Sequence, residues 1–159
     1  MKQLFIVLTC LVLAACSSHK IKEPTLSGLA LQQLQTREYE APYEIVFKSI
    51  VSVLQDTGYI VENADSVTGF ITAKAPSKSN STWNPFTGLG KEHHTTKITA
   101  TAEAIGTEFT KVRLNFVSID EDSSMYGTSR VDTPIEDEEI YRNIFEKIGE
   151  TIFIKQAIN

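Results

Sequence analysis

The fold depends most on residues 97–116, which read KITATAEAIGTEFTKVRLNF. Apolar and polar residues alternate on both sides of Gly106-Thr107, a pattern typical of strands that are buried on one face. Glycine in the first position of this pair predicts a two-residue turn, so the strands would form an antiparallel hairpin that continues to Ile119. Alanine fills most inward positions of the first strand, which indicates that a helix lies close to that face.

Two amphipathic helices are predicted, one before and one after this hairpin. The first follows Pro42 and ends at Gly58, since proline is favoured at a helix start and glycine at its end. Its apolar positions recur at three- and four-residue steps: Tyr43, Val46, Phe47, Ile50, Val53 and Leu54. The second runs from about Ile135 to Ala157, with acidic residues in its first turn. Its apolar positions are Tyr141, Ile144, Phe145, Ile148, Ile152 and Ile154.

Three further strands are expected, at residues 35–40, 59–63 and 69–75. Residues 76–94 are predicted to be a long loop, because they contain Pro76, Pro85, Gly88 and Gly90, and loops of this length are often functional. Residues 120–134 are acidic and are expected to be irregular. Helices and strands therefore separate into two layers, which predicts an α+β domain with an antiparallel sheet of about four to five strands packed on two helices.

The N-terminus has the organisation of a bacterial secretion signal. Lys2 precedes a short apolar run that ends in small residues, and the run is too short for a membrane-spanning helix. Leu13-Ala14-Ala15-Cys16 resembles the lipobox of bacterial lipoproteins, in which the cysteine thiol receives the lipid and becomes the new N-terminus. An ordinary secretion signal with a coincidental cysteine is the alternative. Cys10 lacks the lipobox context and is interpreted as an apolar residue of the signal.

We therefore expect residues 1–15 to be a signal peptide, residues 16–33 a lipidated tether and residues 34–159 one α+β domain. Several acyl chains on Cys16 would anchor the chain stably in a membrane. Ser17 follows the cysteine where aspartate would favour inner-membrane retention, so by analogy with enteric bacteria we expect the outer membrane, with the domain facing the periplasm. Both cysteines lie in residues 1–16, so the domain has no disulfide. The formal net charge of −5, without a basic stripe, argues against nucleic acid as a partner.

Three segments resemble a family of small, poorly characterised bacterial lipoproteins: Gln35-Thr36-Arg37, then Leu54-Gln55-Asp56-Thr57-Gly58-Tyr59, then Gly69-Phe70-Ile71-Thr72-Ala73-Lys74. The shared pattern is a lipobox followed by QTR, LQD-x-G-[FY] and G-x-I-x-A. The layout is also similar to the helix-grip domains of the lipoprotein subunit of the β-barrel assembly machinery, which act by protein contact. This second resemblance is one of architecture. Neither resemblance implies a catalytic residue or a cofactor.

These motifs also have a structural interpretation. Gly58 and Gly69 would permit turns, and Gln55 and Asp56 would meet solvent at a helix end. Arg37 is expected to pair with Asp56 or with the C-terminus of the first helix.

Candidate functional residues are few. Trp83 and Phe86 stand in a polar segment, where they would be either a partner-binding loop or an anchor that folds back over the core. His93-His94, beside Glu92, would be a solvated loop or part of a metal site. The acidic run 120–122, with Asp132, Glu136 and Asp137 beyond it, would be solvated or a weak calcium site, although the EF-hand spacing is absent.

The sequence contains no G-x-S-x-G, H-E-x-x-H or phosphate-binding glycine loop. We therefore predict no catalytic residues, no metal and no cofactor, and a lipid-anchored domain that binds an envelope protein. One alternative is a module that holds a small apolar ligand between sheet and helix. A second alternative is a cell-wall hydrolase, which would bring paired acids or a serine–histidine contact into one cleft.

Overall fold

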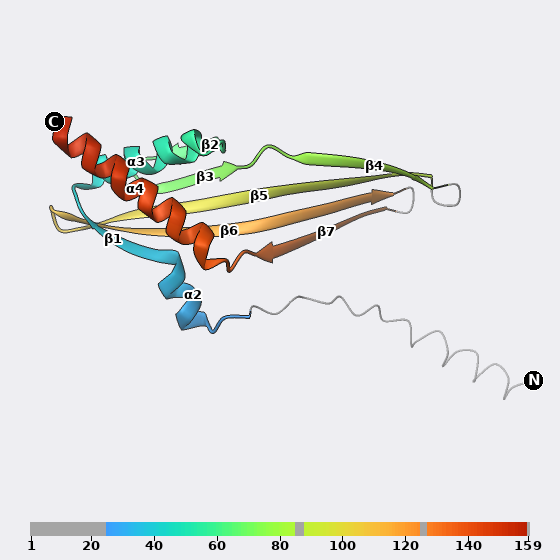
Figure 1. The fold of residues 1–159 in the computed structure, drawn as a ribbon, viewed down its shortest axis with the longest axis horizontal. Helices are drawn as coiled ribbons and strands as arrows, with labels where there is room; N and C mark the ends of the chain where they lie inside the picture. Colours follow the sequence, from blue (N-terminus) through green and yellow to red (C-terminus); the bar gives the residue numbers. More distant parts are fainter. Residues whose placement is uncertain (1–24, 85–87, 125–126, 159) are drawn as a thin grey trace, which may run out of the picture.

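The computed structural model describes residues 25–84, 88–124 and 127–158, and it confirms the α+β class. Three helices and seven strands form the described part (Figure 1). The prediction of two helices and four to five strands missed α2, β4 and β7. In chain order the elements are α2 Gly28–Gln35, β1 Thr36–Glu40, α3 Tyr43–Asp56, β2 Ile60–Asp65, β3 Phe70–Lys74, β4 Lys78–Asn84, β5 Gly88–Ile105, β6 Phe109–Ser124, β7 Gly127–Pro134 and α4 Glu138–Ile158.

Two long central strands, β5 and β6, organise the sheet. Their neighbours give the order β1-β6-β5-β3-β2, and every pairing is antiparallel. β4 continues along β5 where β3 stops, and β7 lies along β6 beyond the end of β1. The sheet therefore has two parts: one half is covered by α3 and α4, and the other half extends past the helices (Figure 1).

The central hairpin has the predicted alternation. Val112, Leu114 and Phe116 are fully buried and pair with Ala102, Ala100 and Ile98 of β5. The prediction of a two-residue turn was wrong, because Ile105 pairs with Phe109 and leaves residues 106–108 as the connection. Gly106 still provides a positive φ of 68°, so a glycine is required where it was expected.

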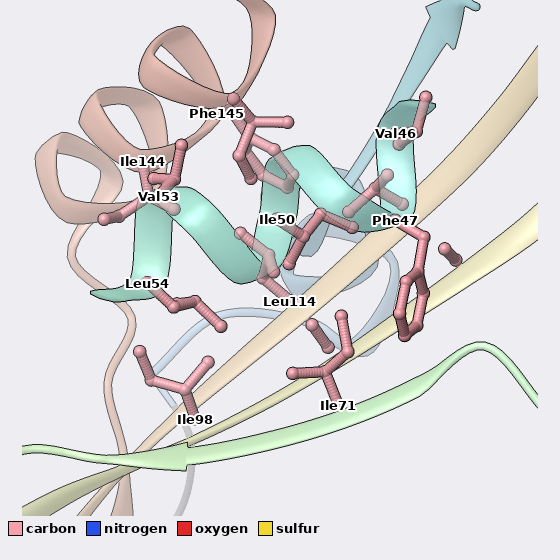
Figure 2. Packing of buried hydrophobic residues seen from close by; sticks show 14 of the residues in the cluster. Val46, Phe47, Ile50, Val53, Leu54, Ile71, Ile98, Leu114, Ile144 and Phe145 are labelled. Carbon is pink, nitrogen blue, oxygen red and sulfur yellow. The ribbon is translucent and has the colours of Figure 1, made fainter. Parts of the chain in front are cut away.

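α3 and α4 cover one face of this hairpin, as their apolar spacing predicted. Figure 2 shows Ile50 and Leu54 of α3 directed at Ile71, Ile98 and Leu114 of the sheet. The small alanines of β5 allow α3 to contact this strand closely. α4 buries five of its apolar positions, but Ile154 is exposed. The buried positions are Tyr141, Ile144, Phe145, Ile148 and Ile152.

α3 ends at Asp56, and the predicted glycine, Gly58, terminates the helix two residues later. The amide of Gly58 donates to the carbonyl of Gln55, and the amide of Tyr59 donates to the carbonyl of Leu54, both at 2.9 Å. These two bonds define a Schellman motif, which needs a left-handed residue, and Gly58 has a φ of 88°. Pro42 is the N-cap of α3, one residue before the first helical position.

Two segments that were expected to be irregular are strands. Residues 76–94 contain β4 and the first part of β5, and residues 120–134 contain the end of β6 and all of β7. Where the exposure of their side chains is described, both faces of these strands are accessible to solvent, so their sequences lack the alternation that marks a half-buried strand. Their order comes from ladder hydrogen bonds along the full length of β5 and β6.

Gly69 holds the turn from β2 to β3 against β5. It has a φ of 74°, its carbonyl accepts a hydrogen bond from the amide of Ala102, and a Cβ there would lie 2.2 Å from the carbonyl oxygen of Ala102. Tyr43 closes the turn by donating to the carbonyl of Ser66 at 2.6 Å. A side chain at position 69 therefore requires the backbone of β3 and β5 to move apart.

We expect Gly69→Ala to lower the free energy of unfolding by at least about 2 kcal/mol, since it combines a strained backbone with a backbone clash. Urea denaturation of the variant and the parent measures this difference. Gly28→Ala is the matched control, because nothing lies within 4 Å of a Cβ at position 28 and no positive φ is required. Equal urea midpoints for the two alanine variants would contradict this account of the turn.

Candidate functional site

The half of the sheet that extends past the helices is the most distinctive surface of the molecule. We call it the arm and define it as residues 78–84, 88–97, 117–124 and 127–134. Ile119 is the only buried residue among those arm residues whose exposure is described. Within the described chain β4 pairs with β5 alone and β7 with β6 alone, so the outer edges of the arm are unpaired. Such edges can accept a further strand.

Trp83 lies toward the far end of the arm. Its backbone belongs to β4 and pairs with Leu89, and the next pair, Asn84 with Gly88, is the last before the turn. Phe86 lies outside the described residues. The strand pairing therefore places position 83 away from the helix-covered core and does not support the expectation that this segment folds back over it.

The acidic run of β6 divides between the two faces of the arm. Asp120 and Asp122 pair with His94 and Glu92 and share the face on which the helices lie, whereas Glu121 points to the opposite face. Since alternate residues of a strand face opposite sides, the three carboxylates do not converge on one ion. No group of three potential metal ligands occurs in residues 25–84, 88–124 and 127–158.

His94 contacts Asp120, a residue that lies far from it in the sequence. Its Nδ1 lies 2.6 Å from Oδ1 of Asp120, in a cleft of about 600 Å³ on the helix side of the arm. The cleft is lined by Lys78, Ser79, Asn80, Glu92, His93, His94, Asp120 and Asp122. Both side chains of this pair are more than half exposed. Water therefore screens the pair, and the low-polarity surroundings that tune catalytic acids and bases are missing at this position.

The opposite face of the arm carries an ion-pair network around Arg130. Its guanidinium contacts Asp132 at 2.7 and 3.1 Å and Glu121 at 3.4 Å. Hydrogen bonding to Arg130 lowers the pKa of Asp132. These charges lie on the edge strand β7 and its neighbour, where charged side chains commonly discourage unspecific edge pairing.

The space between the helices and the sheet is filled by side chains. Val46, Ile50, Leu54, Ile71 and Ile98 have no or almost no exposed surface (Figure 2). The pockets described lie on the arm, on the helix-free face of the sheet and beside α2. A small apolar ligand therefore has no described cavity between the two layers.

The QTR segment has a structural role that differs from the expected one. Arg37 lies over the ring of Phe145 in α4, 5.0 Å from its centroid, so the predicted pairing with Asp56 or the C-terminus of α3 was wrong. β1 pairs with β6 and its inward side chains meet α4, which brings Arg37 to that helix. Tyr39 donates to the carbonyl of Phe145 at 2.7 Å, and burial raises the pKa of its hydroxyl.

Gln35 is buried and fills a gap in the sheet. Residues 114–116 of β6 lie between the pairings with β1 and β7, and Gln35 is placed beside them. Its amide nitrogen lies 3.2 Å from Oδ1 of Asn115 and 3.4 Å from the hydroxyl of Tyr141. Tyr141 in turn accepts from the amide of Phe116. The sequence marked Gln35 only as part of a motif, because its partners are far away in the chain.

The first described residues, 25 and 26, are hydrogen-bonded to the domain. The carboxylate of Glu136 accepts hydrogen bonds from the amides of Thr25 and Leu26, at 3.0 and 3.1 Å, and from the hydroxyl of Thr25. These bonds lower the pKa of Glu136. Glu136 lies between β7 and α4, so residues 25–26 are attached beside the base of the arm. Leu13, Ala14, Ala15 and Cys16 lie outside the described residues.

No protein-family model matches the chain, and no curated protein matches it significantly. In residues 25–84, 88–124 and 127–158, no helix combines the length and the apolar character needed to cross a bilayer. The resemblance to small bacterial lipoproteins therefore stays a prediction from sequence.

We expect Glu136→Ala to release residues 25 and 26 from the domain. Hydrogen exchange of the Leu26 amide should become faster, because its only described acceptor is removed. Below the lowered pKa of Glu136 the parent should lose the same protection, measured relative to the intrinsic exchange rate at that pH, since protonation removes the charge that these bonds stabilise. Glu138→Ala, two residues along, is the control and should leave this amide unchanged. Unaltered exchange in Glu136→Ala would show that other contacts hold the segment.

Proposed function

We propose that the chain is a bacterial lipoprotein, anchored by lipid on Cys16, whose periplasm-facing domain binds another envelope protein through the arm. The arm is the observation that carries this proposal. Four strands project beyond the core with both outer edges unpaired in the described chain, and of the arm residues whose exposure is described only Ile119 is buried. Such a structure contributes little apolar burial to folding, so a binding role explains it better than a stabilising one.

The two outer edges of the arm differ in their charge. β7 carries the Arg130–Asp132 ion pair and ends in Pro134, both of which hinder pairing with a further strand. β4 reads KSNSTWN and has a single charge, at its first residue. The β4 edge is therefore the better template for an added strand, with position 83 near its outer end as an aromatic contact.

The anchor would hold this surface close to the membrane. From Cys16 to Thr25 the chain can span at most about 30 Å when fully extended. Thr25 is bonded to Glu136 beside the base of the arm. A partner would therefore be met within or near the same membrane, and Ser17 after the lipidated cysteine supports the outer membrane.

The two alternatives have less support. A small apolar ligand would need space between the layers, where the described side chains are packed together. A cell-wall hydrolase would need a polarised acid or nucleophile, and the histidine–carboxylate pair of the arm is exposed. Binding to a protein requires neither feature.

Lipidation predicts that the membrane-extracted protein begins at an acylated Cys16. Cys16→Ala should prevent acylation and cleavage, which leaves the signal attached. Mass spectrometry of the N-terminal peptide and fractionation of the cells would measure both effects. Cys10→Ala is the matched control and should be processed normally, because Cys10 has no lipobox before it. A parent protein that is cleaved elsewhere and carries no acyl chain would refute the anchor.

Arm binding predicts one dominant crosslink from position 83. A photo-reactive amino acid placed there in living cells, in the anchored protein, should capture a single envelope protein that mass spectrometry identifies. The control places the same amino acid at position 67, which is 92% exposed in the turn between β2 and β3 and does not belong to the arm. Equal capture from both positions, or crosslinks only within the chain from position 83, would contradict the role of the arm.

A further inference from the structure

A small polar pocket lies on the helix-free face of the sheet, outside the arm. Its volume is about 270 Å³, and it is lined by Gln35, Thr99, Thr101, Arg113 and Asn115. Strand pairing explains why these residues meet: Arg113 lies opposite Thr101, and Asn115 lies opposite Thr99. Gln35 closes one side, where β6 has no neighbouring strand.

Arg113 lacks the ion pair that two other cations of this face make. Lys111 contacts Glu103 at 2.8 Å, and Lys74 contacts Glu62 at 2.6 Å. Arg113 is exposed, and among the described residues its side chain has one hydrogen-bond partner, the neutral side-chain Oε1 of Gln35, to which it donates at 3.3 Å. No described acid lies within ion-pair distance of it. Arg113 is therefore a positive charge of the pocket that has no described acid at ion-pair distance.

The hydrogen bonds of Gln35 also orient the amide of Asn115. Because Oδ1 of Asn115 accepts from Gln35, the side-chain NH₂ of Asn115 is the group left to face the pocket. Gln35 is itself only 4% exposed and donates to the hydroxyl of Tyr141 in the core, so the core fixes the side chain of Gln35 and thereby the orientation of the Asn115 amide. The pocket thus offers guanidinium and amide donors together with two threonine hydroxyls.

We propose that this pocket binds a carboxylate group, held by the guanidinium of Arg113 and the side-chain amide of Asn115. A planar guanidinium fork matches a carboxylate with two parallel hydrogen bonds. One cation balances one negative charge, which suits a carboxylate better than a phosphate ester with its charge near −2. The carboxylate would come from the C-terminus of a peptide or from an acidic side chain. This inference is independent of the envelope function proposed above.

The test is a titration of the full chain, ¹⁵N-labelled and in detergent, followed by NMR of backbone and side-chain N–H groups. N-acetylglycine represents a chain-terminal carboxylate, and N-acetylglutamate N′-methylamide represents a side-chain carboxylate. N-acetylglycinamide is the uncharged control, and inorganic phosphate is the competing anion. We expect at least one acid to shift the signals of Arg113, Asn115, Thr99 and Thr101, and the amide to shift none of them.

Three variants separate binding from folding. Arg113→Gln should weaken binding of the acid by at least about tenfold, since it removes the charge-assisted bonds. Asn115→Asp should abolish binding, because the new carboxylate still accepts from Gln35 while supplying an internal anion to Arg113. Lys111→Gln, on the same face of the same strand, should bind as the parent does.

The preferred acid identifies the source of the carboxylate. The proposal is overturned if the acids and the amide shift the same signals equally, if phosphate alone binds, if no probe binds, or if binding persists in Arg113→Gln. Backbone spectra of each variant establish whether the sheet is intact. If Arg113→Gln does not fold, the comparison of Asn115→Asp with Lys111→Gln tests the proposal alone. Both substitutions change exposed or half-exposed side chains, and both leave an acceptor at position 115 for the side-chain amide of Gln35.

Discussion

The backbone ladder between β5 and β6 is the interaction on which the rest of the structure depends. It runs without interruption from the Lys91–Ser123 pair to the Ile105–Phe109 pair. At the turn end it carries the apolar residues that α3 and α4 cover, and at the other end it carries polar residues on both faces. The arm can therefore form without a core of its own, because its two central strands are already paired and ordered within the core.

The half of the sheet under the helices could be predicted from sequence because its periodicity is caused by burial. Inward positions such as Val112 and Leu114 are apolar because α3 and α4 cover them, and Gly58 and Gly106 stand where a positive φ is required. The arm could not be predicted in this way. Its strands face water on both sides, so no alternation is imposed, and residues such as Pro76 and Gly90 are typical of loops.

The candidate sites could likewise be predicted only in part, because the sequence shows local patterns but not which distant residues meet. The sequence selected position 83 because tryptophan is conspicuous in a polar segment, and only strand pairing places it near the end of the arm. The contact of His94 with Asp120 and the bonds of Gln35 to Asn115 and Tyr141 join residues that lie far apart in the chain. No local pattern marks such partners, so Arg113 looked like an ordinary polar residue of a half-buried strand.

The helix-free face connects the pocket to the arm. Thr101, Thr99 and Lys97 succeed one another on this face of β5, and Arg113, Asn115 and Val117 do so on β6. A peptide that enters along the arm could therefore follow this face without crossing a helix or leaving the sheet. The carboxylate pocket lies at the inner end of that path, where Gln35 links it to Tyr141 of α4. A partner that uses both surfaces would pair with the β4 edge in the plane of the sheet and then cross β5 on this face to reach Arg113 on β6. Arg113 would fix the register of that partner, because a single charged group fits at one position only.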